Sequence, residues 1–159
     1  MTIFNKLVPF TVKSEGVVLL PNGNHKLYKC PAGKWTMGHG YNVEDNGLPD
    51  DIAELLLKRQ LNESKEILEA NVSFFWGLSE NRQLVLIEMC FNMGWPKLRG
   101  FKKMFAALEK GDYEEAANQM IDSKWFRDVG IRAEKLVATM RTDEWHERWN
   151  SFLAYAEEV

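Results

Sequence analysis

A single acidic residue, Glu15, stands among the first 43 residues of the chain, which also contain five lysines. It lies where an apolar segment typical of a helix gives way to short β-like runs. A carboxyl at such a junction can face a cleft, and burial there can raise its pKa enough for general acid catalysis. On position alone, a solvent-exposed glutamate before a helix-ending glycine, Gly16, is the simpler interpretation.

Segment 28–40 holds the next side chains that could do chemistry. It contains one cysteine, Cys30, one threonine, Thr36, and no Asp or Glu. Since the segment has no carboxylate, Cys30 is the candidate base of the hairpin. Gly38 and Gly40 would let a ligand approach the backbone closely, although a strained bend without any ligand would also account for them.

Three polar or aromatic residues of the second half have both a functional and a structural interpretation. Asn92 lies beside a glycine at the predicted end of a helix, so it is either a cap or a ligand amide. Trp125 follows a predicted helix and either stacks on a sugar face or fills the core, where tryptophan is mostly found. Arg132 has the composition of an ordinary helix arginine.

The elements that would position these residues differ between the two halves of the chain. The first half favours a short helix over residues 3–14 and then a small antiparallel sheet with strands in the runs Val17–Leu20, Lys26–Lys29 and Lys34–Met37. The turn signals Pro21-Asn22-Gly23-Asn24 and Pro31-Ala32-Gly33 separate these runs.

Beyond Pro49 the sequence predicts helices almost throughout. A long helix begins at Asp50 or Asp51 and runs to about Ala70. Further helices are expected at 79–91, 101–110, 113–123, 131–142 and 144–156. The fold class is α+β, with a single domain over residues 1–159 divided into a helix and β lobe (1–50), a connecting helix (51–70) and a helical lobe (71–159).

Composition and charge exclude several classes of protein. The 159 residues carry a net charge of −3, which argues against a dedicated nucleic-acid binder. Residues 1–43 have five lysines and one acid, hence +4, whereas residues 44–80 have nine acids and three bases, hence −6. Two cysteines, Cys30 and Cys90, are too few for a disulfide framework or a zinc site. We expect no signal peptide, no membrane anchor and no cofactor.

The order of motifs along the chain resembles the phage-type lysozymes of glycoside hydrolase family 24. The resemblance extends over essentially the whole chain, and no one motif would be specific alone. It rests on Glu15-Gly16, Tyr28-Lys29-Cys30, Trp35-Thr36, Gly38-His39-Gly40, Met89 through Gly94, Gly100-Phe101, Glu114 through Ala117, Ser123 through Phe126, Arg132-Ala133 and Arg141 through Trp145.

The resemblance implies the roles of individual residues. The family's catalytic glutamate, hairpin Asp or Cys, and threonine fall on Glu15, Cys30 and Thr36. Cys30 and Thr36 keep the family spacing, whereas the interval from Glu15 to Cys30 is wider than in the T-even phage enzyme by the turn around residues 20–25. The resemblance further implies that Arg132 pairs with the catalytic glutamate, and that three residues line the saccharide cleft: Gly40, Asn92 and Trp125.

These residue types suit an inverting glycosidase, which needs one acid for the leaving oxygen and a second group for a water on the opposite sugar face. Glu15 would be the acid and Thr36 would hold the water. Cys30 would serve as a base if Lys29 or Lys34 lowered the pKa of its thiol. The implied activity is muramidase cleavage of peptidoglycan between N-acetylmuramic acid and N-acetylglucosamine.

The family resemblance also implies a biological setting. The chain would be a monomeric phage endolysin that stays in the host cytoplasm until a holin opens the membrane and then acts on the cell wall. Two alternatives remain open: a lytic transglycosylase, which needs one acid and no activated water, and a non-catalytic binder of wall glycan.

Overall fold

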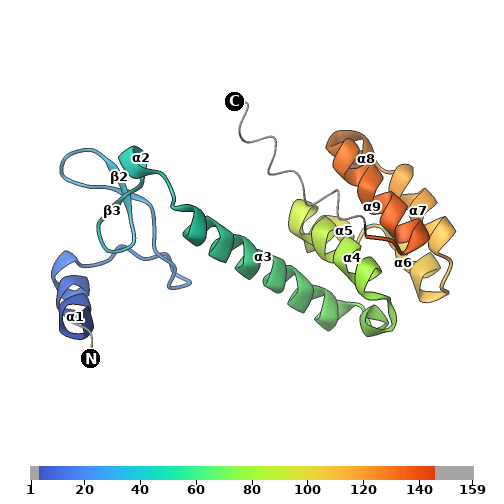
Figure 1. The fold of residues 1–159 in the computed structure, drawn as a ribbon, viewed down its shortest axis with the longest axis horizontal. Helices are drawn as coiled ribbons and strands as arrows, with labels where there is room; N and C mark the ends of the chain where they lie inside the picture. Colours follow the sequence, from blue (N-terminus) through green and yellow to red (C-terminus); the bar gives the residue numbers. More distant parts are fainter. Residues whose placement is uncertain (1–3, 146–159) are drawn as a thin grey trace. The chain divides into compact units, whose positions relative to one another are not determined.

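The predicted α+β composition is present in the computed structural model, which describes residues 4–145 (Figure 1). The chain divides into two compact units, Met1–Leu56 and Leu57–Val159. The long helix α3, Asp50–Asn71, begins in the first unit and ends in the second, within one residue of its predicted bounds. That the two units act as a single domain stays a prediction.

The first unit begins with helix α1, Phe4–Glu15, close to the predicted segment 3–14. Pro9 lies inside this helix, and the hydroxyl of Ser14 donates to the carbonyl of Phe10 at 2.8 Å. Gly16 follows with a φ of 70°, a backbone conformation that ends a helix and that glycine adopts without strain. Glu15 is therefore the last residue of the helix.

A three-stranded antiparallel sheet follows, with the strands in the order β1, β2, β3. The strands are β1 (Tyr28–Lys29), β2 (Trp35–Met37) and β3 (Tyr41–Asn42). Thr36 lies in the middle of the central strand, opposite Tyr28 on one side and Asn42 on the other. The sheet thus places Thr36 at its centre and Cys30 directly after its first strand.

The prediction that Val17–Leu20 forms a strand of this sheet is wrong. The segment makes a separate small hairpin, in which Leu19 bridges to His25 and the Lys26 N–H donates to the Val18 carbonyl at 2.8 Å. The turn at residues 21–24 folds the run back onto its own neighbours, so its backbone groups are satisfied locally. The third strand is Tyr41–Asn42 instead, because the chain reverses at residues 38–40 and returns beside Met37.

A short helix, α2 (Val43–Asn46), closes the first unit's sheet segment. The side chain of Asn42 caps it by accepting a hydrogen bond from the Asp45 N–H at 3.1 Å. Two acidic residues, Glu44 and Asp45, occupy its first turn, where the helix dipole favours negative charge. No helix or strand was predicted for these residues.

The second unit consists of helices, most of which agree with the predicted ranges. They are the 3-10 helix η1 (Phe75–Gly77) and the α-helices α4 (Glu80–Met93), α5 (Trp95–Leu98), α6 (Lys102–Glu109), α7 (Tyr113–Ile121), α8 (Lys124–Val129) and α9 (Ile131–Thr142). Ser79 caps α4, as its position before Glu80 suggests. Three short elements, η1, α5 and α8, were not predicted. The expected helix at 144–156 lies outside the described residues except for Glu144 and Trp145.

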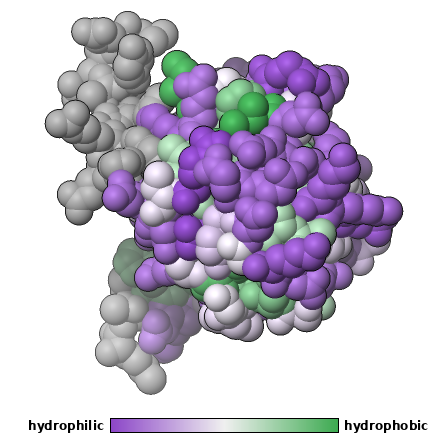
Figure 2. Space-filling model, turned by 90° about the vertical axis from the view of Figure 1, so that its right-hand side faces the viewer, coloured by the Kyte–Doolittle hydropathy of each residue, from purple (hydrophilic) through white to green (hydrophobic). Residues whose placement is uncertain are grey.

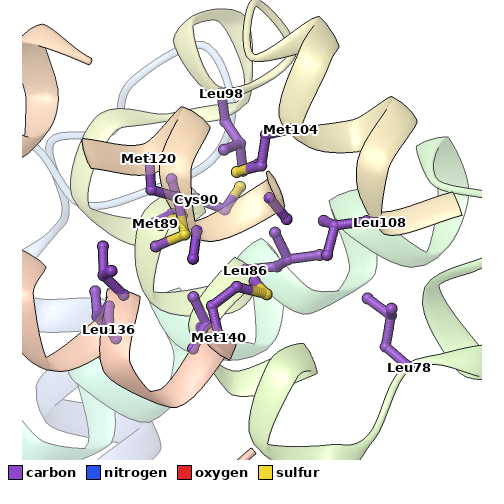
Figure 3. Packing of buried hydrophobic residues seen from close by; sticks show 14 of the residues in the cluster. Leu78, Leu86, Met89, Cys90, Leu98, Met104, Leu108, Met120, Leu136 and Met140 are labelled. Carbon is purple, nitrogen blue, oxygen red and sulfur yellow. The ribbon is translucent and has the colours of Figure 1, made fainter. Parts of the chain in front are cut away.

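The hydrophobic core of the second unit is built around α4, α7 and α9, and α7 packs against both α6 and α9. Four methionines, Met89, Met104, Met120 and Met140, have no exposed surface (Figure 3). Cys90 lies among them with 3% exposure, as a small apolar side chain that fills the core.

One face of this unit is mostly polar. Figure 2 shows the side on which α6–α9 lie in Figure 1, and hydrophilic residues cover most of it. Within residues 4–145, no helix combines the length and the apolar character needed to cross a membrane.

Candidate active site

The carboxyl of Glu15 lies against Gly40, in the turn between β2 and β3. A Cβ atom added to Gly40 would sit 3.2 Å from Glu15 Oε2, closer than most Cβ contacts. Gly40 also has a φ of 89°, in the region that side chains rarely adopt. The positive φ favours glycine at position 40, and a larger residue there would also require the Glu15 carboxyl to shift. The predicted acid and one predicted cleft residue are brought together.

Cys30 is a reduced, half-buried cysteine at the start of the turn from β1 to β2. Its N–H donates to the Lys34 carbonyl at 3.0 Å, and its own carbonyl accepts from the Gly33 N–H at 2.8 Å. Hydrogen bonding from the Lys34 backbone lowers the pKa of the thiol, with smaller contributions from the Ala32 backbone and the Thr36 hydroxyl, while partial burial opposes the shift.

The two lysines expected to lower that pKa have other charged or aromatic partners. The Lys34 ammonium is 2.7 Å from Asp45 Oδ1 and 3.3 Å from Glu44 Oε1. The Lys29 ammonium lies over the Trp35 ring, 5.1 Å from its centroid. The prediction was right about Lys34 but wrong about the group: the backbone of Lys34, and not its ammonium, gives the largest lowering of the Cys30 pKa.

Thr36 is 3% exposed, and it is the one buried residue among the described residues of the first unit. Its hydroxyl donates to the Lys34 carbonyl at 3.1 Å. The same carbonyl accepts from the Cys30 N–H, so one backbone oxygen orients both residues of the predicted pair. A threonine hydroxyl that donates its hydrogen bond to a carbonyl can still accept hydrogen bonds through its lone pairs, including one from water.

The predicted cleft residues of the second unit form a pair. The Trp125 indole N–H donates to Asn92 Oδ1 at 2.9 Å. Trp125 follows α7 as predicted but lies inside a further helix, α8, and it is 8% exposed, so most of its ring contacts the core. Asn92 lies on the last turn of α4, where Gly94 is the C-cap, so the capping interpretation of Asn92 is wrong.

Arg132 forms an ion pair and a hydrogen bond with Glu88 of α4. Both residues line an apolar groove of about 980 Å³ between α3, α4 and α9, together with residues such as Leu61, Ile87 and Leu136. The implied pairing of Arg132 with Glu15 joins residues of different units and stays a prediction.

Sequence reasoning missed Glu44 and Asp45, which contact the hairpin that carries Cys30 and Thr36. Besides its ion pair with Lys34, Glu44 accepts a hydrogen bond from the Trp35 N–H at 3.0 Å. The available signal was the capping pattern from Asn42 to Asp45. In the part of the chain that the structure describes, no group of three His, Cys, Asp or Glu residues could hold a metal ion.

Comparison with known proteins identifies a family. The family described as phage lysozyme matches residues 16–144, a range that includes Cys30, Thr36 and Gly40 and begins directly after Glu15. An endolysin from Acyrthosiphon pisum secondary endosymbiont phage 1 is 25% identical over 121 residues, which cover 72% of this chain and 79% of that protein.

Two proteins of Dictyostelium discoideum are also similar. Probable T4-type lysozyme 1 is 23% identical over 112 residues, covering 67% of this chain and 66% of its own length. Probable T4-type lysozyme 2 is 23% identical over 146 residues, covering 74% of this chain and 86% of its own length. All three relatives are distant.

Proposed function

Because the chain belongs to the phage lysozyme family, we propose that it is a peptidoglycan-degrading muramidase. It hydrolyses the β-1,4 bond between N-acetylmuramic acid and N-acetylglucosamine. The observation that supports this most directly is the shared carbonyl of Lys34, which holds the buried Thr36 hydroxyl and the Cys30 backbone in one arrangement. A hydrolase needs a fixed acceptor for its water, and this hydroxyl is one.

The proposed reaction inverts the configuration of the sugar. Glu15 gives its proton to the leaving glycosidic oxygen. A water on the opposite face donates one hydrogen bond to Thr36 and attacks the anomeric carbon, and its proton passes to the Cys30 thiolate. The lowered pKa of Cys30 supports this role, because it increases the thiolate fraction near neutral pH.

The remaining predicted residues bind the saccharide or support the catalytic acid. Gly40 lies against the Glu15 carboxyl, and its lack of a side chain would let a sugar approach the backbone beside the acid. Asn92 accepts from the Trp125 indole through Oδ1, and the two ends of an amide point apart, so its nitrogen is directed away from Trp125 as a donor to the saccharide. Arg132 supports the acid by favouring its ionised form after proton transfer.

The biological role proposed is that of a phage endolysin in host cell lysis. The similarity to an endolysin supports this role. The enzyme is made in the host cytoplasm, gains access to the periplasm and wall through the action of a holin, and acts as a monomer without a cofactor or a nucleic-acid partner.

A wall-clearing assay on purified peptidoglycan tests the catalytic assignment. Glu15→Gln should lower the clearing rate by about 10²-fold or more, because loss of a general acid typically costs 10²–10⁴-fold. Thr36→Val and Cys30→Ala should each lower kcat. If Glu15→Gln clears walls as fast as the wild type, the assignment of the acid is wrong. If Cys30→Ala alone keeps full activity, Thr36 and water suffice and the thiol has no catalytic role.

A lytic transglycosylase is the second candidate, since Glu15 is the one acid of the first 43 residues. The next acids, Glu44 and Asp45, are engaged with Lys34. Mass spectrometry separates the reactions, because transglycosylase products are lighter by one water and end in an anhydro sugar. A non-catalytic glycan binder would retain wall binding without clearing.

A further inference from the structure

The hairpin that carries Cys30 and Thr36 is held from outside by a carboxylate that belongs to neither strand. We propose that Glu44 is a positioning residue for this site: it fixes the orientation of the Lys34–Trp35 peptide, and that peptide orients the Thr36 hydroxyl and Cys30. The catalytic part of this inference rests on the proposed function. The geometric part does not, because it concerns only how the hairpin is held.

The argument begins with one peptide unit. The Trp35 N–H and the Lys34 carbonyl belong to the same planar group and point in opposite directions. The N–H donates to Glu44 Oε2 at 3.0 Å. On the other side of the plane, the carbonyl accepts from the Thr36 hydroxyl at 3.1 Å and from the Cys30 N–H at 3.0 Å. Rotation of this peptide would break all three hydrogen bonds together.

The charge of Glu44 strengthens this arrangement. A hydrogen bond to an ionised carboxylate is stronger than one to a neutral acceptor, and donation by the N–H polarises the peptide so that its carbonyl becomes a better acceptor. The Lys34 carbonyl therefore accepts a stronger hydrogen bond from the Thr36 hydroxyl. The hydroxyl then presents lone pairs to a water, which leaves a lone pair of that water free to attack.

Glu44 is itself held in place by its neighbours. Its second oxygen, Oε1, lies 3.3 Å from the Lys34 ammonium. Asp45 pairs with the same ammonium at 2.7 Å through Oδ1 and accepts from the Asn42 side chain at 2.9 Å through Oδ2. Asn42 also caps α2 and lies opposite Thr36 in the sheet. The carboxylate is thus attached both to the short helix and to the strand it orients.

The arrangement also accounts for the character of Cys30. The Lys34 N–H gives the largest lowering of the thiol pKa by donating to the sulfur. It lies one peptide before the unit that Glu44 holds, on the residue whose carbonyl belongs to that unit. Loss of Glu44 should therefore weaken this hydrogen bond to the thiolate, even though Glu44 is negative and its removal would by charge alone favour a thiolate. The two effects have opposite signs, which makes the thiol pKa a decisive measurement.

The test compares Glu44→Ala, Glu44→Gln and a matched control, Glu63→Ala, which removes an exposed ion pair with Arg59 in α3. Two quantities are measured on the intact protein: kcat and KM on soluble peptidoglycan fragments, and the pH profile of Cys30 alkylation, read by peptide mapping so that Cys90 is followed separately. Thermal unfolding monitored by circular dichroism shows that each variant is folded.

Glu44→Ala should lower kcat by about tenfold or more with little change in KM, as expected when a reacting group is misplaced. It should also raise the pKa of the Cys30 thiol. Glu44→Gln keeps an acceptor for the Trp35 N–H and should recover most of both quantities, and Glu63→Ala should match the wild type.

The inference is overturned if Glu44→Ala matches Glu63→Ala in kcat and in the alkylation profile, or if its Cys30 pKa falls. If the wild type cleaves no peptidoglycan, the proposed function fails while the alkylation profiles still decide the geometric part. Should Glu44→Ala not fold, Glu44→Leu, which keeps similar volume without an acceptor for the Trp35 N–H, carries the test: a lowered kcat and a raised Cys30 pKa support the inference, and wild-type values of both overturn it.

Discussion

The interactions that stabilise the first unit internally differ from those that stabilise the second. Every buried apolar side chain among the described residues belongs to the second unit or to its end of α3. In the first unit the one buried residue described is Thr36, which is proposed to accept a hydrogen bond from the attacking water. The first unit depends on its backbone turns, its short sheet and the contacts of Lys34 with Glu44 and Asp45.

The difference separates stability from chemistry. A core of aliphatic and thioether groups gains free energy in proportion to the apolar area it buries and is sensitive to lost volume. A small sheet held by hydrogen bonds and exposed ion pairs gains less, but it can hold polar groups such as the Thr36 hydroxyl in a defined orientation. The second unit should therefore respond to changes of volume, and the first to changes of charge and pH.

The largest effect is expected from a core truncation. Leu86 has no exposed surface, so Leu86→Ala should lower the free energy of unfolding by about 2–5 kcal/mol. Leu84→Ala is the matched control on the same helix, because Leu84 is 37% exposed, and it should cost about 1 kcal/mol or less. Urea unfolding followed by tryptophan fluorescence measures both. Equal losses would contradict the assignment of the core.

The two cysteines offer a direct comparison of the units. Cys30 is half-buried and its thiol pKa is lowered, chiefly by hydrogen bonding from the Lys34 backbone. Cys90 is 3% exposed, and burial raises the pKa of its thiol. In the native protein, iodoacetamide should modify Cys30 at least about tenfold faster than Cys90. Peptide mapping measures the two rates, which should converge in urea; similar native rates would contradict the described environments.

The smallest effect is expected from the pH dependence of the contacts that Lys34 makes with its acidic partners. Hydrogen bonding to Lys34 lowers the pKa of Asp45 below its ordinary 3.8, so this contact stabilises the folded unit above pH 3.8 and is lost as the pH falls through the lowered value. The pKa of Lys34 is raised above 10.5, so its contribution is complete below that pH and is lost as the pH rises through the raised value.

Nuclear magnetic resonance can follow this transition through the Trp35 amide, which lies in the same hairpin. Part of the movement of this resonance below pH 4 should come from the protonation of Asp45. Asp45→Asn should remove that component of the shift. If wild type and variant move identically in acid, Asp45 does not control the hairpin.

Much of the fold was predictable because local signals and tertiary packing agree. Ser79 caps α4 where the predicted helix begins, and the long helix predicted from Asp50 or Asp51 agrees with α3 within one residue of its end. The strand predicted at Val17–Leu20 shows the opposite case. An apolar β-like run specifies an extended backbone but not its partner, and the turn at residues 21–24 supplied a local one.

The candidate site was predictable in its residues but not in its connections. The motif spacing pointed to Cys30 and Thr36, and both lie on the hairpin expected to carry them. The Lys34 carbonyl that they share, and the carboxylate of Glu44 behind it, come from the way α2 folds back on β2. A backbone oxygen has no signature in the sequence, so this part of the site required the structure.

The four buried methionines have a consequence for the chemical ageing of the protein. While the core is closed, the sulfur atoms of Met89, Met104, Met120 and Met140 are shielded from peroxide. Each opening of the second unit exposes thioethers whose sulfoxides are polar and fit an apolar interior poorly. Oxidised chains would then fail to close again, so oxidative damage would accumulate in proportion to the time that the core has spent open.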